Sequence, residues 1–382
     1  MSPISSSTVA AQAPKRFAYV DELRGFAVLL VAFVHIGFYF DEDMGITHIS
    51  RYGQYGVQLF FMLSAFTLCH SMDRLPRMGQ GDYQAFFIKR WFRIAPLYFC
   101  ALVFYTLYSL ASHQLFGKTP WTEPSAFSLG GFLTNLTFTH GLWPPAVNQV
   151  VPGGWSIGCE FLFYSLFPFL FFATRNRPWL LGCLIAVCIP MASALPKVLS
   201  TLGWLEPPGN DSFAYFSVIN QLPCFLMGMI YFHFKDQKVF RFLGIGMMAP
   251  LGVLLAVLHP QSFGWNFTPL VAGMLFVGFA LLIEVLPRFQ ILARIGECSF
   301  SIYLVHFFIT WNLGVLFLRK FPAFLSQPLS ALAIYAAVVI ISYIVSRWTY
   351  QHIELRSIAK GHAVAGSLKE KRKLKMVNLR PE

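Results

Sequence analysis

An apolar stretch near the start of the chain, residues 26–40, contains His35 and directly follows Arg24. In a helix, residues eleven positions apart lie within about 20° of one another around the axis and roughly 16 Å apart along it. If this stretch crosses a membrane, His35 lies deep inside it on the face that carries Arg24, with Asp21 within about 40° of that face. Ionisable groups at such depth are functional candidates, although a histidine that only hydrogen-bonds a neighbouring helix would give the same pattern.

The composition of the whole chain favours a membrane protein. Of its 382 residues, 56% are hydrophobic and 12% are charged, and the mean hydropathy is +0.57. These values differ from those of ordinary soluble domains. The net charge of +12 does not indicate nucleic-acid binding, because the basic residues lie in short loops and near the C-terminus. Membrane lipids are the expected partners of these residues.

Ten apolar runs have a length that spans or nearly spans a bilayer. They cover about residues 25–40, 56–72, 94–115, 154–173, 179–197, 215–234, 242–258, 268–286, 297–318 and 329–351. We therefore predict an all-α polytopic membrane protein, with a bundle of about ten transmembrane helices in a domain over 18–358. A polar tail, 1–17, precedes this domain and a basic tail, 359–382, follows it. Residues 126–142 form a re-entrant or half-spanning segment, or an eleventh span.

Lysine and arginine alternate between the loops of this ten-span arrangement. They concentrate before the first span, in the second, fourth, sixth and eighth loops, and in the C-terminal tail, with Arg319 and Lys320 in the ninth loop as the exception. The positive-inside rule then places both termini in the cytoplasm. We expect the C-terminal tail to rest on anionic headgroups or to be disordered. The sequence leaves the oligomeric state open.

Three cations cluster at the start of the third span. Lys89, Arg90 and Arg93 occupy about one helical turn, in which Arg90 and Arg93 are neighbours. The cluster has two explanations. It anchors the helix at the cytoplasmic interface, or it forms an anion site, because guanidinium groups bind phosphates in bidentate geometry.

Two further spans carry polar side chains. In the fourth, Ser156, Glu160 and Tyr164 recur every four residues and form a polar stripe that begins beside Trp155. A carboxylate there requires a cationic or hydrogen-bonding partner in the bundle. In the ninth span, Tyr303 and His306 lie one turn apart. The role of His306 is open between a structural hydrogen bond and direct participation in chemistry.

In this order, the motifs resemble the integral-membrane acyltransferase family 3. The hallmark of that family, an Arg or Lys followed after ten residues by His in the first span, matches Arg24 and His35. Residues 56–64, 90–96, 155–160 and 299–306 also look like family motifs, and Glu354 matches a carboxylate after the last span. Ala65 departs from the family, which usually has glycine there.

This resemblance implies transfer of an acyl group, with acetyl as the first candidate, from cytoplasmic acyl-CoA to a hydroxyl of a cell-surface or lipid-linked carbohydrate. It implies that the reaction needs no metal. It implies a multi-pass protein of the bacterial inner membrane. In this reading His35 is the general base, Glu160 orients it or binds the acceptor, and Asp21 orients Arg24. The expected coenzyme-binding residues are Arg24, Arg90, Arg93, Lys89, Tyr303 and His306, and the expected acceptor-binding residues are Trp155, Ser156 and Tyr164.

The alternative function is a proton-coupled transporter or flippase of a polar or glycan substrate. His35 and Glu160 would then form a proton relay, and the cationic cluster would serve topology alone. A structural scaffold explains the ionisable groups inside the spans poorly. The sequence leaves open the acceptor, the length of the acyl group, the membrane side on which the acceptor is modified, and whether an acyl-enzyme forms.

Overall fold

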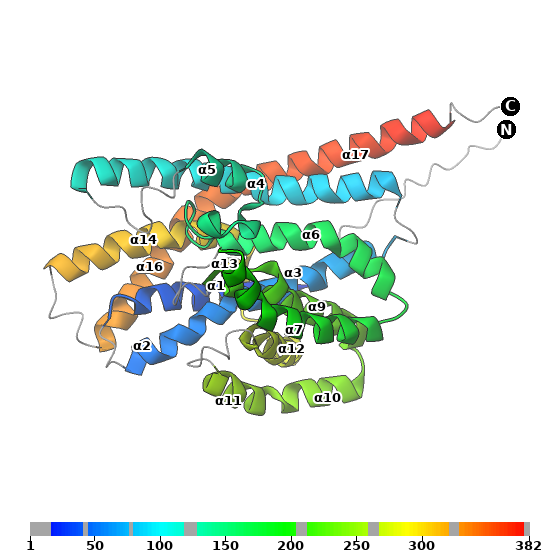
Figure 1. Cartoon of the computed structure of the whole chain (residues 1–382), viewed down its shortest axis with the longest axis horizontal. Helices are drawn as coiled ribbons and strands as arrows, with labels where there is room; N and C mark the ends of the chain where they lie inside the picture. The colour runs from blue at the N-terminus through cyan, green and yellow to red at the C-terminus, as the bar shows by residue number, and fades with distance from the viewer. Residues whose placement is uncertain are drawn as a thin grey trace.

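The computed structural model describes residues 17–40, 45–75, 79–117, 128–203, 212–258, 267–320 and 328–377, and these residues form helices and connecting turns without a strand. The fold is an all-α polytopic membrane bundle (Figure 1). Its principal helices are α1 (Ala18–Gly37), α3 (Gly56–Met72), α4 (Gln80–Phe116), α6 (Gly154–Thr174), α7 (Trp179–Thr201), α9 (Val218–Phe234), α12 (Thr268–Val285), α14 (Ser299–Lys320) and α16 (Pro328–Thr349). Shorter helices are α2 (Gly45–Ser50), α5 (Leu129–Leu136), α8 (Ser212–Phe216), α10 (Lys238–Gly246), α11 (Met248–Leu258) and α13 (Gln290–Glu297).

Seven helices in the described ranges are long and apolar enough to cross a membrane, or eight if the bent pair α10 and α11 forms one span. The two other predicted spans correspond to α1 and α3. Helix α1 has 20 residues but carries Asp21, Glu22 and Arg24 in its first two turns, and α3 has only 17 residues. These two helices lie in the interior of the bundle, where protein neighbours replace lipid around their polar groups.

The segment 126–142 does not form an eleventh span. Its described part contains α5, with eight residues, and a short 3-10 turn at His140–Leu142. Eight helical residues extend about 12 Å, less than half of a hydrocarbon core. The half-spanning interpretation therefore agrees with the structure.

Helix α1 packs closely against α13, which directly precedes α14, and two glycines allow this approach. A Cβ atom at Gly25 would lie 2.1 Å from the carbonyl oxygen of Leu292, and one at Gly296 would lie 1.7 Å from that of Asp21. The buried carboxylate of Glu22 joins the same two elements, since it accepts a hydrogen bond from the Phe289 amide at 3.2 Å. The crossing therefore fixes the depth of α1, and with it the positions of Arg24 and His35.

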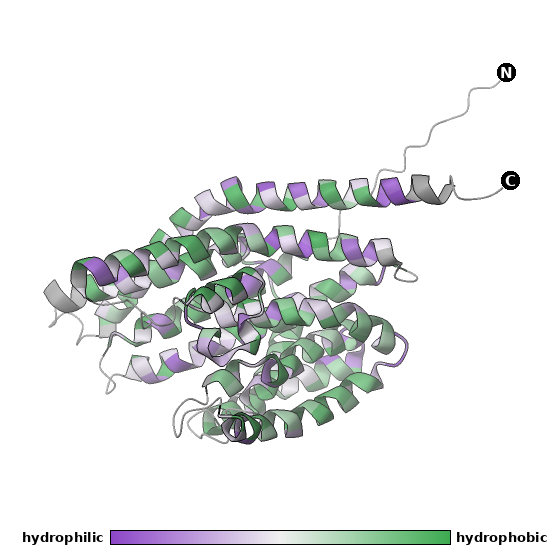
Figure 2. Cartoon of the chain, turned by 45° about the horizontal axis from the view of Figure 1, so that its top comes forward, coloured by the Kyte–Doolittle hydropathy of each residue, from purple (hydrophilic) through white to green (hydrophobic). Residues whose placement is uncertain are grey.

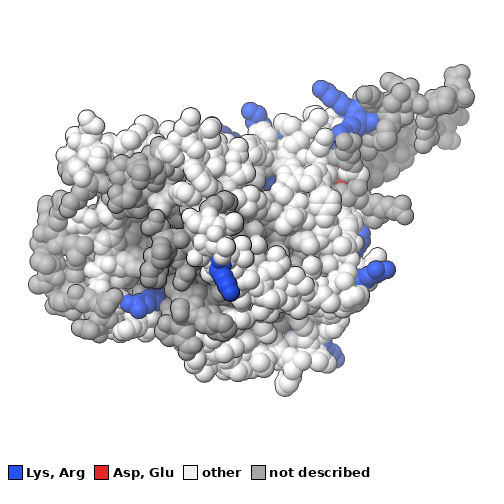
Figure 3. Space-filling view, in the orientation of Figure 1, with Lys and Arg blue, Asp and Glu red and all other residues white. Residues whose placement is uncertain are grey.

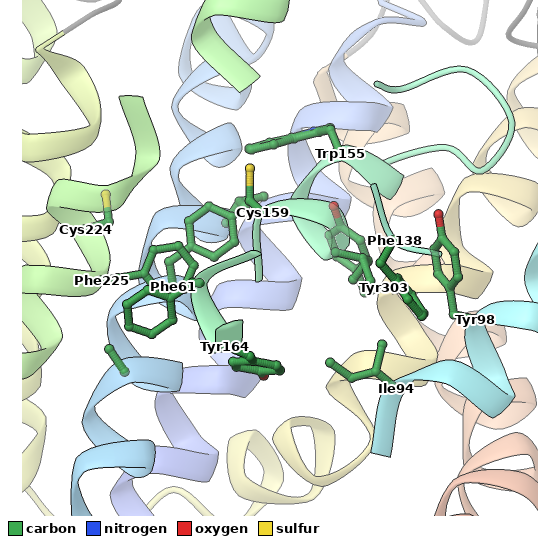
Figure 4. Packing of buried hydrophobic residues seen from close by; sticks show 14 of the residues in the cluster. Phe61, Ile94, Tyr98, Phe138, Trp155, Cys159, Tyr164, Cys224, Phe225 and Tyr303 are labelled. Atoms are coloured by element: carbon green, nitrogen blue, oxygen red, sulfur yellow. The ribbon is translucent and has the colours of Figure 1, made fainter. Parts of the chain in front are cut away.

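Aromatic side chains fill much of the space between α3, α6 and α9 (Figure 4). Phe225 stacks against Phe61 at 4.4 Å between ring centroids and against Phe163 at 4.0 Å. On the other side of α6, Phe138 and Phe161 stack at 3.8 Å. Such contacts add to the burial of large apolar surfaces, so α6 is held rigidly from both sides.

The C-terminal segment is not a disordered tail over its described length. Helix α17 (Leu355–Val377) continues from α16 through a π-helical turn and packs along the first half of α4 (Figure 1). Lys369 pairs with Asp82 at 2.6 Å and Arg372 donates to Gln84 at 2.8 Å. Figure 2 shows α17 as more hydrophilic than the bundle, and Figure 3 shows Lys and Arg on the side from which it projects as well as scattered over the rest of this face.

The α1–α13 crossing provides a test of the fold. Gly25→Ala should lower the free energy of unfolding by about 1–3 kcal/mol, because the added methyl group overpacks the contact with Leu292. The matched control is Gly182→Ala in α7, where no atom lies within 4 Å of the added Cβ. Thermal unfolding of both variants in lipid nanodiscs measures the difference, and equal midpoints would contradict the crossing.

Candidate active site

Polar residues of α1, α3, α4, α6 and α14 line two adjoining cavities. One, the arginine cavity, has a volume of about 80 Å³ and is lined by Arg24, Ser64, Thr67, Arg90, Arg93, Ser156, Glu160, Tyr164, Ser299 and Tyr303 together with apolar residues. The other, the histidine cavity, has a volume of about 580 Å³ and includes His35 among its lining residues. Val57 and Tyr303 line both cavities, so the two spaces meet at these side chains.

The two cavities lie at different levels along the helices. Helix α1 contributes Arg24 to the arginine cavity and, three turns later, His35 to the histidine cavity. Helix α6 passes them in the reverse order, with Trp155 in the histidine cavity and Tyr164 in the arginine cavity. Figure 4 shows the same order, with Trp155 near the top of the view, Tyr164 near the bottom and Tyr303 between these levels. The cavities are therefore stacked along the bundle axis.

The arginine cavity is strongly cationic. Its described lining carries the guanidinium groups of Arg24, Arg90 and Arg93 against the single carboxylate of Glu160. Arg24 pairs with Asp21 at 3.4 Å, as the sequence predicts, because α1 extends back to Ala18. Among the described residues, Arg93 makes no side-chain hydrogen bond and the buried Nε of Arg90 has no hydrogen-bond partner. Unsatisfied guanidinium donors around one space favour an anionic ligand.

Glu160 accepts hydrogen bonds from two other lining residues of this cavity. Its Oε1 accepts hydrogen bonds from Ser64 Oγ at 2.6 Å and from the Tyr164 hydroxyl. It also interacts electrostatically with Arg24 and Arg90. The structure thus supplies the cationic and hydrogen-bonding partners that the sequence requires for a carboxylate at this depth. It does not bring Glu160 to His35, which lines the other cavity.

The partner of His35 is the second intramembrane histidine. Nδ1 of His35 lies 2.6 Å from the Val31 carbonyl oxygen and 3.3 Å from Nε2 of His306, whose own Nδ1 lies 3.0 Å from the Ile302 carbonyl oxygen. A carbonyl only accepts hydrogen bonds, so both Nδ1 atoms carry protons and Nε2 of His306 is the acceptor toward His35. This tautomer assignment leaves Nε2 of His35 with a lone pair and, among the described residues, without a hydrogen bond.

The tyrosine at the junction is also anchored. The Tyr303 hydroxyl lies 2.8 Å from Ser156 Oγ and 2.9 Å from the carbonyl oxygen of Gly153. Gly153 begins α6 with a φ of +72°, and a Cβ atom there would lie 2.7 Å from the Tyr303 hydroxyl. A side chain at this position would therefore be strained and would also displace Tyr303.

The predicted site residues are thus divided between the cavities. Arg24, Arg90, Arg93, Ser156, Glu160 and Tyr164 line the arginine cavity, Trp155 lines the histidine cavity with His35, and Tyr303 lines both. Asp21 and His306 lie behind Arg24 and His35 respectively. Lys89 is exposed and lines neither cavity. No group of three or more His, Cys, Asp or Glu residues with metal-binding geometry occurs in the described ranges.

Two residues of the site were not among those selected from the sequence. Ser64, which donates to Glu160, ends the stretch 56–64 that looks like a family motif, but the sequence assigns its side chain no role. Glu354 is buried, accepts a hydrogen bond from Ser301 at 3.0 Å, and interacts electrostatically with Arg93 and Arg24. The family resemblance indicates a carboxylate at position 354, but its place after the last span does not indicate that it approaches Arg93 and Arg24.

Comparisons with known proteins agree with the geometry. A family model described as an acyltransferase domain matches residues 17–347. Acyltransferase MdmB from Streptomyces mycarofaciens is 29% identical over 324 residues, which cover 77% of this chain and 79% of that protein. Protein 2 in the picA locus of Rhizobium radiobacter is 32% identical over 135 residues, 35% of this chain and 66% of that protein. No solved structure matches the chain.

The position of Glu160 among three arginines predicts its contribution to stability. Glu160→Gln should lower the free energy of unfolding by about 3 kcal/mol, because it leaves buried guanidinium charges without their carboxylate. The control is Glu284→Gln, which removes a carboxylate that pairs with Arg241 at 2.8 Å and Lys235 at 3.4 Å at a partly exposed site. That change should cost less than about 1 kcal/mol. Denaturant unfolding in nanodiscs compares the two, and an unchanged midpoint for Glu160→Gln would contradict the charge balance described here.

Proposed function

The chain belongs to the acyltransferase 3 family of integral-membrane acyltransferases, and on this basis we propose that it transfers an acyl group, in first place acetyl, from acyl-CoA to a hydroxyl group of a carbohydrate. The main support for this proposal is that the cationic arginine cavity adjoins the histidine cavity, where His35 has an Nε2 lone pair that can accept a proton. The first fits a polyanionic thioester donor and the second fits an alcohol acceptor.

The arginine cavity is the proposed donor site. Arg24, Arg90 and Arg93 bind phosphate oxygens of the coenzyme, and Asp21 and Glu160 hold Arg24 and Arg90 in place. The cavity is narrow, with a volume of about 80 Å³, which suits the diphosphate and the start of an extended pantetheine arm rather than the adenosine. The arm then carries the thioester past Tyr303 toward His35, while the adenosine stays outside the bundle.

His35 is the proposed general base. Its Nε2 takes the proton from the acceptor hydroxyl as the oxygen attacks the thioester carbonyl carbon. The new C–O ester bond forms, the C–S bond breaks, and the coenzyme thiolate receives the proton from the imidazolium. His306 keeps the ring of His35 in the required orientation, because its Nε2 accepts a hydrogen bond from His35 Nδ1 and leaves His35 Nε2 for the acceptor. Tyr303, fixed by Ser156 and Gly153, positions the thioester at the junction.

The arrangement also supports an orientation in the membrane. Arg24 lies in the N-terminal half of α1 and the positive-inside rule places this end of the helix in the cytoplasm. We therefore propose that both termini are cytoplasmic, in a bacterial inner membrane, and that the arginine cavity opens toward the cytoplasmic acyl-CoA pool. The histidine cavity then lies toward the opposite face, from which the acceptor enters.

The role of His35 is tested by transfer of radiolabelled acetyl groups from acetyl-CoA to an extracted glycan fraction. His35→Ala should reduce the rate about 10²- to 10⁴-fold, the usual range for loss of a general base. The control is His352→Ala, at an exposed histidine beyond α16. Activity equal to wild type in His35→Ala would remove this residue as the base.

The donor site is tested by the dependence of the rate on acetyl-CoA concentration. Arg93→Ala should raise the KM for acetyl-CoA about tenfold or more, because a charge-assisted hydrogen bond to phosphate is lost. Lys89→Ala is the matched control, since Lys89 is a neighbouring cation in α4 that lines neither cavity. If wild-type protein binds no coenzyme even with acceptor present, the proposed donor is wrong and the transporter alternative is favoured.

A further inference from the structure

The histidine cavity has a size that limits its occupant. Its volume of about 580 Å³ falls within the range of about 300–1,000 Å³ that is typical of small-molecule sites. Such a cavity encloses most of a molecule of one or two rings with a substituent. The part of the acceptor that reaches His35 is therefore compact.

The described lining of this cavity contains no lysine, arginine, aspartate or glutamate. The cations of the site, Arg24, Arg90 and Arg93, line the arginine cavity instead. A carboxylate, sulfate or phosphate on the acceptor would therefore enter a space of low dielectric without a counter-charge. That costs several kcal/mol, so the cavity discriminates against anionic acceptors.

Aromatic rings dominate the same lining. They come from α6, α8 and α14 and from the two residues that follow α1: Phe38, Tyr39, Trp155, Tyr215, Phe216, Tyr303, Phe307 and Trp311. Trp155 stacks on Phe216 at 4.5 Å, and Phe307 lies 4.4 Å from the imidazole of His35. Flat apolar walls of this kind bind the C–H face of a sugar ring and, with more area, an apolar substituent.

The polar side chains of this lining are His35, Gln54, Asn148 and Thr310, together with the hydroxyls of its tyrosines. Asn148 uses its Oδ1 to accept the Gly153 amide at 3.0 Å, so its amide NH₂ is the group that can reach an acceptor hydroxyl. His35 supplies Nε2 on another wall. These uncharged groups match the hydroxyls of a sugar, whereas the aromatic wall beside them offers a large apolar area to a second part of the ligand.

From these four properties we infer that the acceptor is an uncharged glycoside with an apolar aglycone, bound with its sugar hydroxyl at His35 and its aglycone on the aromatic wall. This inference rests on the proposed function for the identity of the reacting group. The chemistry of the cavity itself, neutral and aromatic, can be tested by binding alone.

The test uses three soluble probes that differ in one property each. Phenyl β-glucoside carries a neutral sugar and an apolar aglycone, phenyl β-glucuronide replaces the sugar CH₂OH by a carboxylate, and methyl β-glucoside lacks the aromatic aglycone. Isothermal titration calorimetry is done with wild-type protein in phosphatidylcholine nanodiscs, whose zwitterionic lipid does not repel the anion. Phenyl β-glucoside should bind at least tenfold more tightly than either of the other probes. Equal or tighter binding of the glucuronide or the methyl glucoside, or no saturable binding of phenyl β-glucoside, would overturn the inference.

A pair of tryptophan variants locates the binding. Trp311→Ala should weaken binding of phenyl β-glucoside about threefold to tenfold, as expected for loss of one aromatic contact. Trp348→Ala, at a 59% exposed tryptophan of α16 outside both cavities, should leave it unchanged. If Trp311→Ala does not elute as a folded protein in size-exclusion chromatography, Phe216→Leu takes its place. Its control is then Phe289→Leu, at an exposed phenylalanine. Equal affinities in a variant and its control would place the glycoside elsewhere.

Failure of this inference and failure of the proposed function give different results. The same preparations are incubated with radiolabelled acetyl-CoA and each probe. Binding with the expected preference but no acetyl transfer to any hydroxyl would refute the acyltransfer to carbohydrates and leave the cavity assignment in place. Transfer to the glucuronide in preference to the glucoside would refute the cavity assignment and support the acyltransfer.

Discussion

The contact on which the site depends is the close crossing of α1 and α13 at Gly25 and Gly296. It holds α1 in the interior, where Arg24 and His35 must find partners in protein because lipid offers none. Asp21 meets Arg24 within the helix, and His306 meets His35 from α14. Since α13 directly precedes α14, one crossing sets the position of both histidines. A change in its depth would separate them and would also move Arg24 out of the arginine cavity.

Charge is distributed between the two cavities in a way that matches two substrates of opposite character. Three guanidinium groups and Glu160 line the narrow cavity, whereas the described lining of the larger one is uncharged and aromatic. Val57 and Tyr303 separate them. In the proposed reaction, the polyanionic coenzyme and the acceptor approach along one axis from opposite ends and meet at His35. Neither substrate then has to pass through the space that binds the other.

Periodicity and the cost of buried charge predict much of this arrangement from sequence. The all-α fold, the shared face of Arg24 and His35, and the need of Glu160 for partners follow from local rules, and the structure confirms them. Tertiary proximity does not follow from local rules. Helix packing brings His35 into contact with His306, although the two residues are 271 positions apart in the chain. It also places Glu160 away from His35 and brings Glu354 close to the arginines. The same limit applies to α17, whose basic composition predicts a tail that rests on anionic headgroups or is disordered. Its contact with α4 instead gives it a fixed position.

The measurement that tests the central claim most directly is a cryo-electron microscopy structure in nanodiscs with a non-hydrolysable acetyl-CoA analogue. The account predicts coenzyme phosphates at Arg24, Arg90 and Arg93, a pantetheine arm that passes Tyr303, and a carbonyl carbon at the histidine cavity. An acceptor oxygen held beside Nε2 of His35 could then approach that carbon to about 3–3.5 Å, the distance required for attack. Phosphates bound in the histidine cavity, or a thioester that remains on the arginine side of Tyr303, would contradict the two-cavity account.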